Sequence, residues 1–109
     1  MLAKINLLQL GTALLGPHTN QVVANLNDHC LRIAVNEDNQ YPWHSHPDSD
    51  ELFVVLNGHL RLELVDGSCI DLYPQDCYCV PRGVVHRTQA LGRTVNLCYE
   101  LATATTVFV

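Results

Sequence analysis

Few residues of this chain are charged, and only a minority of those are basic. Charged residues make up 16% of the 109 positions, against about 25% in an average domain. The 6 Lys and Arg residues are scattered singly, and the formal net charge is −5. A protein that binds nucleic acid or an anionic membrane surface needs a basic patch to meet phosphates. We therefore expect neither nucleic acid nor a membrane as a partner.

The chain also lacks a long apolar run and a disulfide framework. No stretch approaches the ~20 apolar residues that span a bilayer. Residues 1–16 are rich in leucine, but Lys4, Asn6 and Gln9 interrupt them, which makes a weak signal peptide. The 5 cysteines are an odd number, and reduced thiols are typical of cytosolic proteins. These absences predict a cytoplasmic protein.

The residues that are present predict a single all-β domain after a short helix. Hydrophobic residues make up 48% of the chain, enough for a core, and the length suits one domain. Apolar spacing over residues 4–15 predicts a short helix. Short strands with regular punctuation follow and favour a sandwich or small barrel, the jelly roll among them. The predicted strands are 22–23, 30–35, 52–56, 60–64, 69–72, 77–80, 84–89 and 94–101.

Two tight turns divide the middle of the chain. Asn57-Gly58 and Asp66-Gly67 are both strong signals for a hairpin. Residues 52–56 are apolar throughout, as in a strand covered on both faces. We expect residues 1–29 to pack on a barrel domain formed by residues 30–109.

The spacing of several histidines indicates a candidate metal site. His44 and His46 lie two residues apart, so on a strand their side chains share one face. Glu51 follows, and His86 comes later, after a turn that contains Pro81. Neutral imidazole suits Zn, Cu, Fe and Ni, and carboxylate suits harder ions. Spacing alone shows only the pairing of the first two histidines; it does not bring the other two groups to the same point.

These residues stand in a pattern that resembles the cupin superfamily, in particular its small single-domain members of the Cupin_2 type. The first cupin motif reads G-x5-H-x-H-x3–4-E-x6-G, and this chain has His44-x-His46-x4-Glu51-x6-Gly58. The second motif reads G-x5-P-x-G-x2-H-x3-N, and this chain has Pro81-x-Gly83-x2-His86. The opening glycines of the two motifs and the closing asparagine of the second are replaced by Asp38, Gln75 and Ala90.

The resemblance implies a jelly-roll barrel with one divalent metal ion, Fe, Mn, Zn or Ni. It implies that the ligands are His44, His46, Glu51 and His86. It also implies a function: a metal-binding cupin that acts on or binds a small oxygen-bearing molecule. Isomerase, oxygenase, lyase and decarboxylase activities all remain open, because fold does not fix chemistry. The alternative is a non-catalytic, metal-dependent small-molecule sensor or binding module.

Outside the four candidate metal ligands, the sequence predicts pocket, surface and core positions for other side chains. The candidates for the substrate pocket are Phe53, which shares strand parity with Glu51, Tyr78, and Arg82 in the turn near the barrel mouth. We expect His18, His29 and His59 at the surface, residues 48–50 in a solvated loop, and Cys77 and Cys79 as small buried hydrophobes. The low charge fraction and the aliphatic N-terminal segment predict a homodimer.

Overall fold

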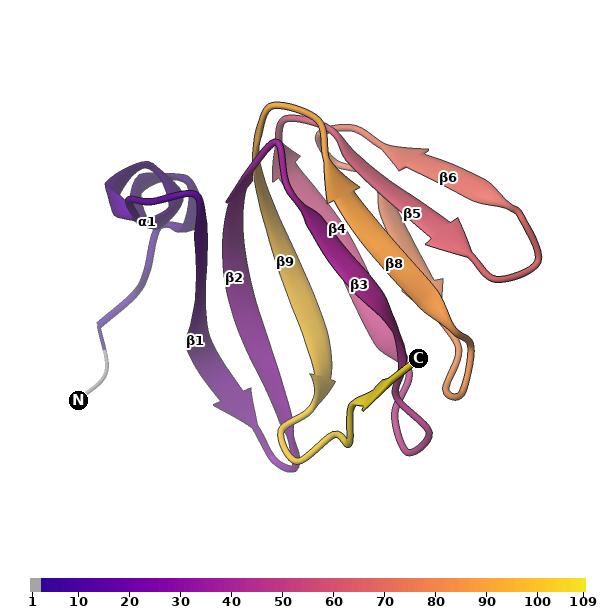
Figure 1. Ribbon diagram of the computed structural model, residues 1–109. Helices are drawn as coiled ribbons and strands as arrows, with labels where there is room; N and C mark the ends of the chain where they lie inside the picture. Colours follow the sequence, from indigo (N-terminus) through magenta and orange to yellow (C-terminus); the bar gives the residue numbers. More distant parts are fainter. Residues whose placement is uncertain (1–2) are drawn as a thin grey trace.

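Two antiparallel five-stranded sheets lie face to face in the computed structural model, which describes residues 3–109 (Figure 1). The first sheet has the strand order β1-β2-β9-β4-β7, and the second has the order β10-β3-β8-β5-β6. This is an all-β jelly roll with one short N-terminal helix, as predicted. The elements are α1 (Leu7–Ala13), β1 (His18–Leu26), β2 (His29–Glu37), β3 (Gln40–Ser45), β4 (Glu51–Asn57), β5 (Leu60–Leu64), β6 (Cys69–Leu72), β7 (Cys77–Val80), β8 (His86–Ala90), β9 (Arg93–Leu101) and β10 (Val107–Phe108).

Apolar side chains form two clusters, one on each face of the first sheet. The cluster between the sheets joins β4, β7 and β9 to the second sheet, and its buried members are Phe53, Val55, Leu60, Leu62, Leu72, Val80 and Cys98. The cluster on the outer face contains Ile33, Val35, Val95 and Leu97, with Val54 and Leu56 packed against it. Strand β4 therefore has apolar contacts on both faces, as its uniform composition predicts.

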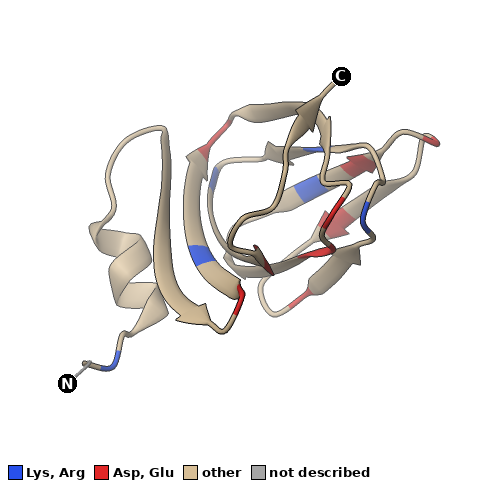
Figure 2. Ribbon diagram, turned by 90° about the horizontal axis from the view of Figure 1, so that it is seen from below, with Lys and Arg blue, Asp and Glu red and all other residues tan. Residues whose placement is uncertain are grey.

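Helix α1 covers the outer cluster. Its Leu7 and Leu10 pack there, and the backbone of Gly11 lies so close to the sheet that an added Cβ would meet Val95 at 2.8 Å. Asn6 caps the first turn, because its side chain accepts a hydrogen bond from the Gln9 N–H at 3.0 Å. Both views of the ribbon place the helix outside the sandwich, beside β1 (Figures 1 and 2).

The Asn57-Gly58 turn does not close a hairpin, and this prediction is wrong. It links β4 in the first sheet to β5 in the second, so the strands that it joins are not paired. Gly58 packs against the start of β9, where a Cβ would lie 2.4 Å from the Arg93 carbonyl oxygen at a φ of +88°. The turn thus carries the chain across the end of the sandwich. The Asp66-Gly67 turn does close a hairpin, between β5 and β6.

Several strands differ from their predicted extent. Strand β1 is longer than the predicted pair of valines. Strand β8 begins at His86, two residues later than predicted, because the Val84 N–H donates to the Pro81 carbonyl across the preceding turn. Strand β10 at the C-terminus was not predicted; it pairs with the end of β3. Cys77 and Cys79 are exposed on β7 rather than buried, because Val80 and Tyr78 occupy the inward positions of that strand.

No helix in residues 3–109 is long and apolar enough to cross a membrane. The lysine and arginine positions are dispersed over the fold (Figure 2).

Candidate metal centre

Four buried side chains meet between the two sheets. His44, near the end of β3, lies directly opposite His86, the first residue of β8, and Glu51 begins β4. His46 follows β3 by one residue. The exposed fractions of these four residues are at most 7%. One potential ligand atom from each lies within 4.8 Å of the others, which brings together the two groups that spacing alone left apart.

Backbone carbonyl groups orient the three imidazoles. The Nδ1 atoms of His44, His46 and His86 lie 2.8, 3.0 and 2.9 Å from the carbonyl oxygens of Pro42, Thr105 and Val84. A carbonyl oxygen only accepts, so each Nδ1 must carry the proton. The Nε2 atoms then face the cluster, and fixing the outer nitrogen in this way is typical of metal-ligating histidine. The donor set and its tautomers fit a divalent metal.

The loop between His46 and Glu51 is held in place by the C-terminal segment. Asp48 accepts hydrogen bonds from both the backbone N–H and the hydroxyl of Thr105, whose carbonyl receives the His46 Nδ1–H. Ser49 is buried, with its hydroxyl oxygen accepting from the Leu101 N–H at 3.0 Å. The prediction that residues 48–50 form a solvated loop is therefore wrong at Ser49, because the end of β9 covers it.

The two sequence motifs are joined at His46. Its carbonyl oxygen accepts a hydrogen bond from the N–H of Gly83, in the turn before His86, at 2.9 Å. The opening position of each motif, glycine in the cupin pattern, keeps a left-handed backbone here although the residue is not glycine. Asp38 and Gln75 have φ values of 41° and 77°. The left-handed conformation costs an ordinary residue about 1–2 kcal/mol.

Ion pairing dominates the electrostatics of the cluster. Glu51 Oε1 lies 3.1 Å from His46 Nε2 and 3.3 Å from His86 Nε2. The hydrogen bond to Glu51 outweighs burial and raises the pKa of His46 to about 9. Burial raises the pKa of Glu51, but the hydrogen bonds from the two histidines outweigh it and lower the pKa to about 2. Burial lowers the pKa of His44. In the absence of metal, a proton on His46 thus balances the carboxylate.

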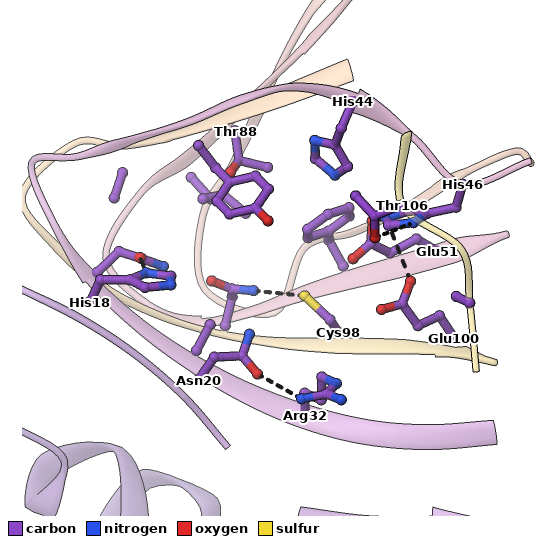
Figure 3. A pocket seen from close by; sticks show the side chains of 18 of the residues that line it. His18, Asn20, Arg32, His44, His46, Glu51, Thr88, Cys98, Glu100 and Thr106 are labelled. Atoms are coloured by element: carbon purple, nitrogen blue, oxygen red, sulfur yellow. Dashed lines mark hydrogen bonds and ion pairs between the residues drawn. The ribbon is translucent and has the colours of Figure 1, made fainter. Parts of the chain in front are cut away.

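A cavity of about 410 Å³ opens beside the cluster (Figure 3). His44, His46, Glu51 and Phe53 lie in its wall, so Phe53 is where its strand parity predicts. Tyr78 does not line the cavity; it sits opposite Phe53 on β7 and packs against the inner apolar cluster. Arg82 is exposed and lines a separate hollow, where its backbone N–H donates to Asp50.

Polar residues of β1, β2 and β9 complete the cavity wall, and they were not predicted there from the sequence. They are His18, Asn20, Arg32, Asn36, Asn96 and Glu100. His18 is exposed, as predicted, but its ring also contacts the side chain of Asn36 at the cavity. The alternation of β2 was the available signal: Leu31, Ile33 and Val35 are the residues that α1 and its cluster cover, so the residues between them face inward.

Glu100 is the missed residue that lies nearest the cluster. Its Oε2 is 3.6 Å from His46 Nε2 and has no hydrogen-bond partner, although its side chain is only 14% exposed. Burial and the neighbouring Glu51 charge raise the pKa of Glu100. The C-terminal segment adds Thr106, whose hydroxyl lies 3.4 Å from His46 Nδ1.

Comparison with known proteins matches this architecture. The Cupin_2 profile, which describes a cupin domain, covers residues 31–99. The chain belongs to the cupin family. This cupin is 44% identical over 104 residues to the uncharacterized protein YdbB of Bacillus subtilis (strain 168), a match that covers 95% of this chain and 91% of that protein.

Solved structures share the fold. A cupin-2 domain containing protein from Shewanella frigidimarina superposes with a TM-score of 0.82 at 28% identity, covering 89% of this chain and 93% of that one. Protein NMB1881 from Neisseria meningitidis gives a TM-score of 0.80 at 22% identity, over 92% of this chain and 100% of that one.

Proposed function

We propose that this cupin holds one divalent metal ion with His44, His46, Glu51 and His86 and uses it to bind a small oxygen-bearing molecule. The observation that carries the proposal is the convergence of four buried ligand atoms within 4.8 Å, with the Nδ1 of each imidazole donating to a backbone carbonyl so that Nε2 faces inward. Imidazole and carboxylate together suit Fe, Mn, Zn or Ni.

A divalent metal supplies Lewis acidity there, or reactivity toward oxygen if it is iron. The protein supplies the rest of the site. Phe53 is 4% exposed and gives the cavity an apolar wall next to His86, their ring centroids 6.1 Å apart. The unpartnered Oε2 of Glu100 is placed to accept a hydrogen bond from a ligand beside the cluster. A cavity of about 410 Å³ suits a small molecule.

Metal analysis tests the proposal. We expect close to one divalent ion per chain after purification without chelator, and loss of most of it in His46→Ala. The matched control is His18→Ala, because His18 lines the same cavity but lies outside the cluster. Full metal occupancy in His46→Ala would overturn the assignment.

The second candidate is a binding or sensor module without turnover. This candidate is kept because Glu100 is the one carboxylate outside the proposed ligands that the described part of the chain brings to the cluster, where its Oε2 lies 3.6 Å from His46 Nε2 without a hydrogen bond. Turnover of a panel of small oxygen-bearing compounds under air and under nitrogen separates the two. We further propose a cytoplasmic homodimer, on the low charge fraction and on leucines of the N-terminal region that stay exposed, such as Leu8 at 56%.

A further inference from the structure

Arg32 differs from most other arginines of the chain in having no carboxylate partner. Arg61, Arg87 and Arg93 form ion pairs with Asp71, Glu63 and Glu37 at 2.9, 2.6 and 3.2 Å. The guanidinium of Arg32 makes one hydrogen bond, from Nη1 to the side-chain oxygen of Asn20 at 3.3 Å. No carboxylate in residues 3–109 lies within ion-pairing distance of it.

Arg32 lies in the cavity wall rather than at the outer surface. It stands on β2 opposite Cys98 of β9, on the face of the sheet that also carries Phe53. Figure 3 shows Arg32 and Asn20 across the cavity from His44, with Cys98 between them. A guanidinium offers five N–H donors, and Asn20 uses one of them. The remaining donors are available to a molecule in the cavity.

Because Arg32 is half-buried, part of its guanidinium is shielded from water, and an anion in the cavity would make charge-assisted hydrogen bonds in place of the lost hydration. The charged groups nearest the cavity do not supply that anion. Glu51 is balanced by His46, and Glu100 lies against His46 at 3.6 Å. Burial raises the pKa of Glu100, and the Arg32 charge acts in the opposite direction.

From this arrangement we infer that the ligand of the cavity is a small carboxylic acid with a second oxygen group, and that Arg32 and Asn20 hold its carboxylate while the second oxygen faces the histidine–glutamate cluster. Planar guanidinium binds carboxylate through two parallel hydrogen bonds. The inference rests on the proposed function for the second oxygen, but the carboxylate anchor does not involve a metal ligand.

The chemistry of the wall favours a carboxylate over a phosphate. Arg32 is the only Lys or Arg among the described residues that line the cavity, and its single positive charge balances a carboxylate but not a phosphate dianion. A hydroxyl group on the ligand would also give the unpartnered Oε2 of Glu100 a donor. A hydroxy acid therefore complements three features of the cavity at once.

Calorimetric titration of Ni²⁺-loaded and metal-free protein tests the inference. The probes are glycolate, 3-hydroxypropionate and 4-hydroxybutyrate, each paired with its neutral amide, and inorganic phosphate. We expect at least one of the two longer acids to bind roughly 10- to 100-fold more tightly than its amide, because a hydrogen bond to a charged group is worth about 1.5–3 kcal/mol. Glycolate is an internal comparison, since its hydroxyl and carboxylate are on adjacent carbons and can chelate one metal ion together.

Variants then assign the preference to Arg32. Arg32→Gln should bind the acid and its amide equally, and Arg32→Lys should keep part of the preference. Arg61→Gln makes the same change on β5, where the side chain pairs with Asp71 outside the cavity, and should behave as the native chain. Thermal melting confirms that each variant is folded. The double variant Arg32→Gln/Glu100→Gln should also bind the acid and its amide equally. A return of the preference for the acid in this double variant would show that Arg32 only balances the charge of Glu100.

Each result bears on one proposal. An acid preference that survives Arg32→Gln, the absence of any preference in the native chain, or tighter binding of phosphate than of every acid would overturn the inference. Failure of the protein to take up Ni²⁺ would overturn the proposed function instead. In that case the metal-free titration still tests the anchor, because Arg32 lies outside the metal-ligand cluster.

Discussion

The ion pair between His46 and Glu51 makes metal binding compete with a proton. The pKa of His46 is about 9 and that of Glu51 is about 2 in the metal-free cluster. At neutral pH the cluster therefore holds a protonated imidazole beside a carboxylate. Because imidazole must be neutral to coordinate a metal, an incoming ion has to displace that proton. We expect each bound metal to release about one proton at pH 8 and to bind more tightly as pH rises.

The magnitude follows from the pKa of His46. If this group alone titrates with a pKa of about 9, raising the pH from 7.0 to 8.5 should lower the apparent Kd for metal about 25-fold. Three histidines at the ordinary value of about 6.5 would give only about a twofold change over that range. At pH 8 the two cases differ further, with about 0.9 proton released in the first and about 0.1 in the second.

Competition against a chelator of known pH dependence measures the affinity, and calorimetry in buffers of different ionisation enthalpy counts the protons. Two metals are compared, because a metal-bound water can also release a proton and its pKa depends on the metal. The proton released from His46 should be the same for both metals. An NMR titration of the metal-free protein follows the imidazoles directly, with His46→Gln to assign the resonance and His18→Gln as control. A His46 pKa near 6.5 together with a twofold change in Kd would refute the reasoning.

The same pair sets the pH dependence of folding in the metal-free protein. The raised pKa of His46 contributes stability that is fully present below 6.5 and is lost as the pH rises through about 9. The lowered pKa of Glu51 contributes stability that is present above 4.5 and is lost as the pH falls through about 2. Both describe one interaction, worth roughly 3 kcal/mol. We expect the free energy of unfolding to be greatest between pH 4.5 and 6.5, where both contributions are fully present.

Four further outcomes are expected. Gln75→Gly should raise stability by about 0.5–1 kcal/mol in denaturant melts, because Gln75 has a φ of 77° and no side-chain hydrogen bond among the described residues. Asp38→Gly is its control and should not gain as much, since the Asp38 carboxylate accepts the Gly92 N–H at 2.6 Å; equal gains would contradict the argument. Gly58→Ala should lose at least about 2 kcal/mol, because its Cβ would meet the Arg93 carbonyl oxygen at 2.4 Å, and an unchanged melt would exclude that clash. Chelation should leave β-type circular dichroism but lower the melting temperature by about 10–30 °C; a random-coil spectrum would instead make the metal structural. Light scattering should give twice the chain mass at micromolar concentration, and the monomer mass would reject the dimer.

Local signals in the sequence were sufficient for most of the fold. Alternation and turn residues predicted the β elements because each reports on its immediate neighbours along the chain. Asn57-Gly58 misled because a tight turn specifies a reversal of direction, not the partner of the next strand. Gly58 packs on β9, far along the chain, and that contact sends β5 into the other sheet. Strand β10 was missed because two residues pairing with Ser45 and His44 carry almost no periodicity of their own.

The candidate ligands were recognised as a pattern, whereas the rest of the cavity was not. His44 and His46 share a face by strand periodicity, but only the fold brings Glu51 and His86 to them. Arg32 and Glu100 alternate with apolar residues along their strands, a pattern that usually places the apolar side chains in the barrel and the polar ones in solvent. Here helix α1 covers the aliphatic face of β2 from outside, so the polar face of the strand is the one that points into the barrel. That reversal depends on a contact between distant segments and is invisible in either one.

The two apolar clusters explain how a small barrel tolerates this polar interior. Between the sheets, apolar packing is concentrated around β4, β5, β6 and β7, while the inward faces of β1 and β2 carry Asn20, Arg32 and Asn36. Those two strands would gain little from burial inside the barrel. The larger apolar side chains of β2 lie on the outer face, where Ile33 and Val35 pack with α1. Arg93 holds the helix there by donating to the Gly11 carbonyl at 2.8 Å. The helix thus stabilises the wall from outside and leaves its inner face available for the polar groups that line the cavity.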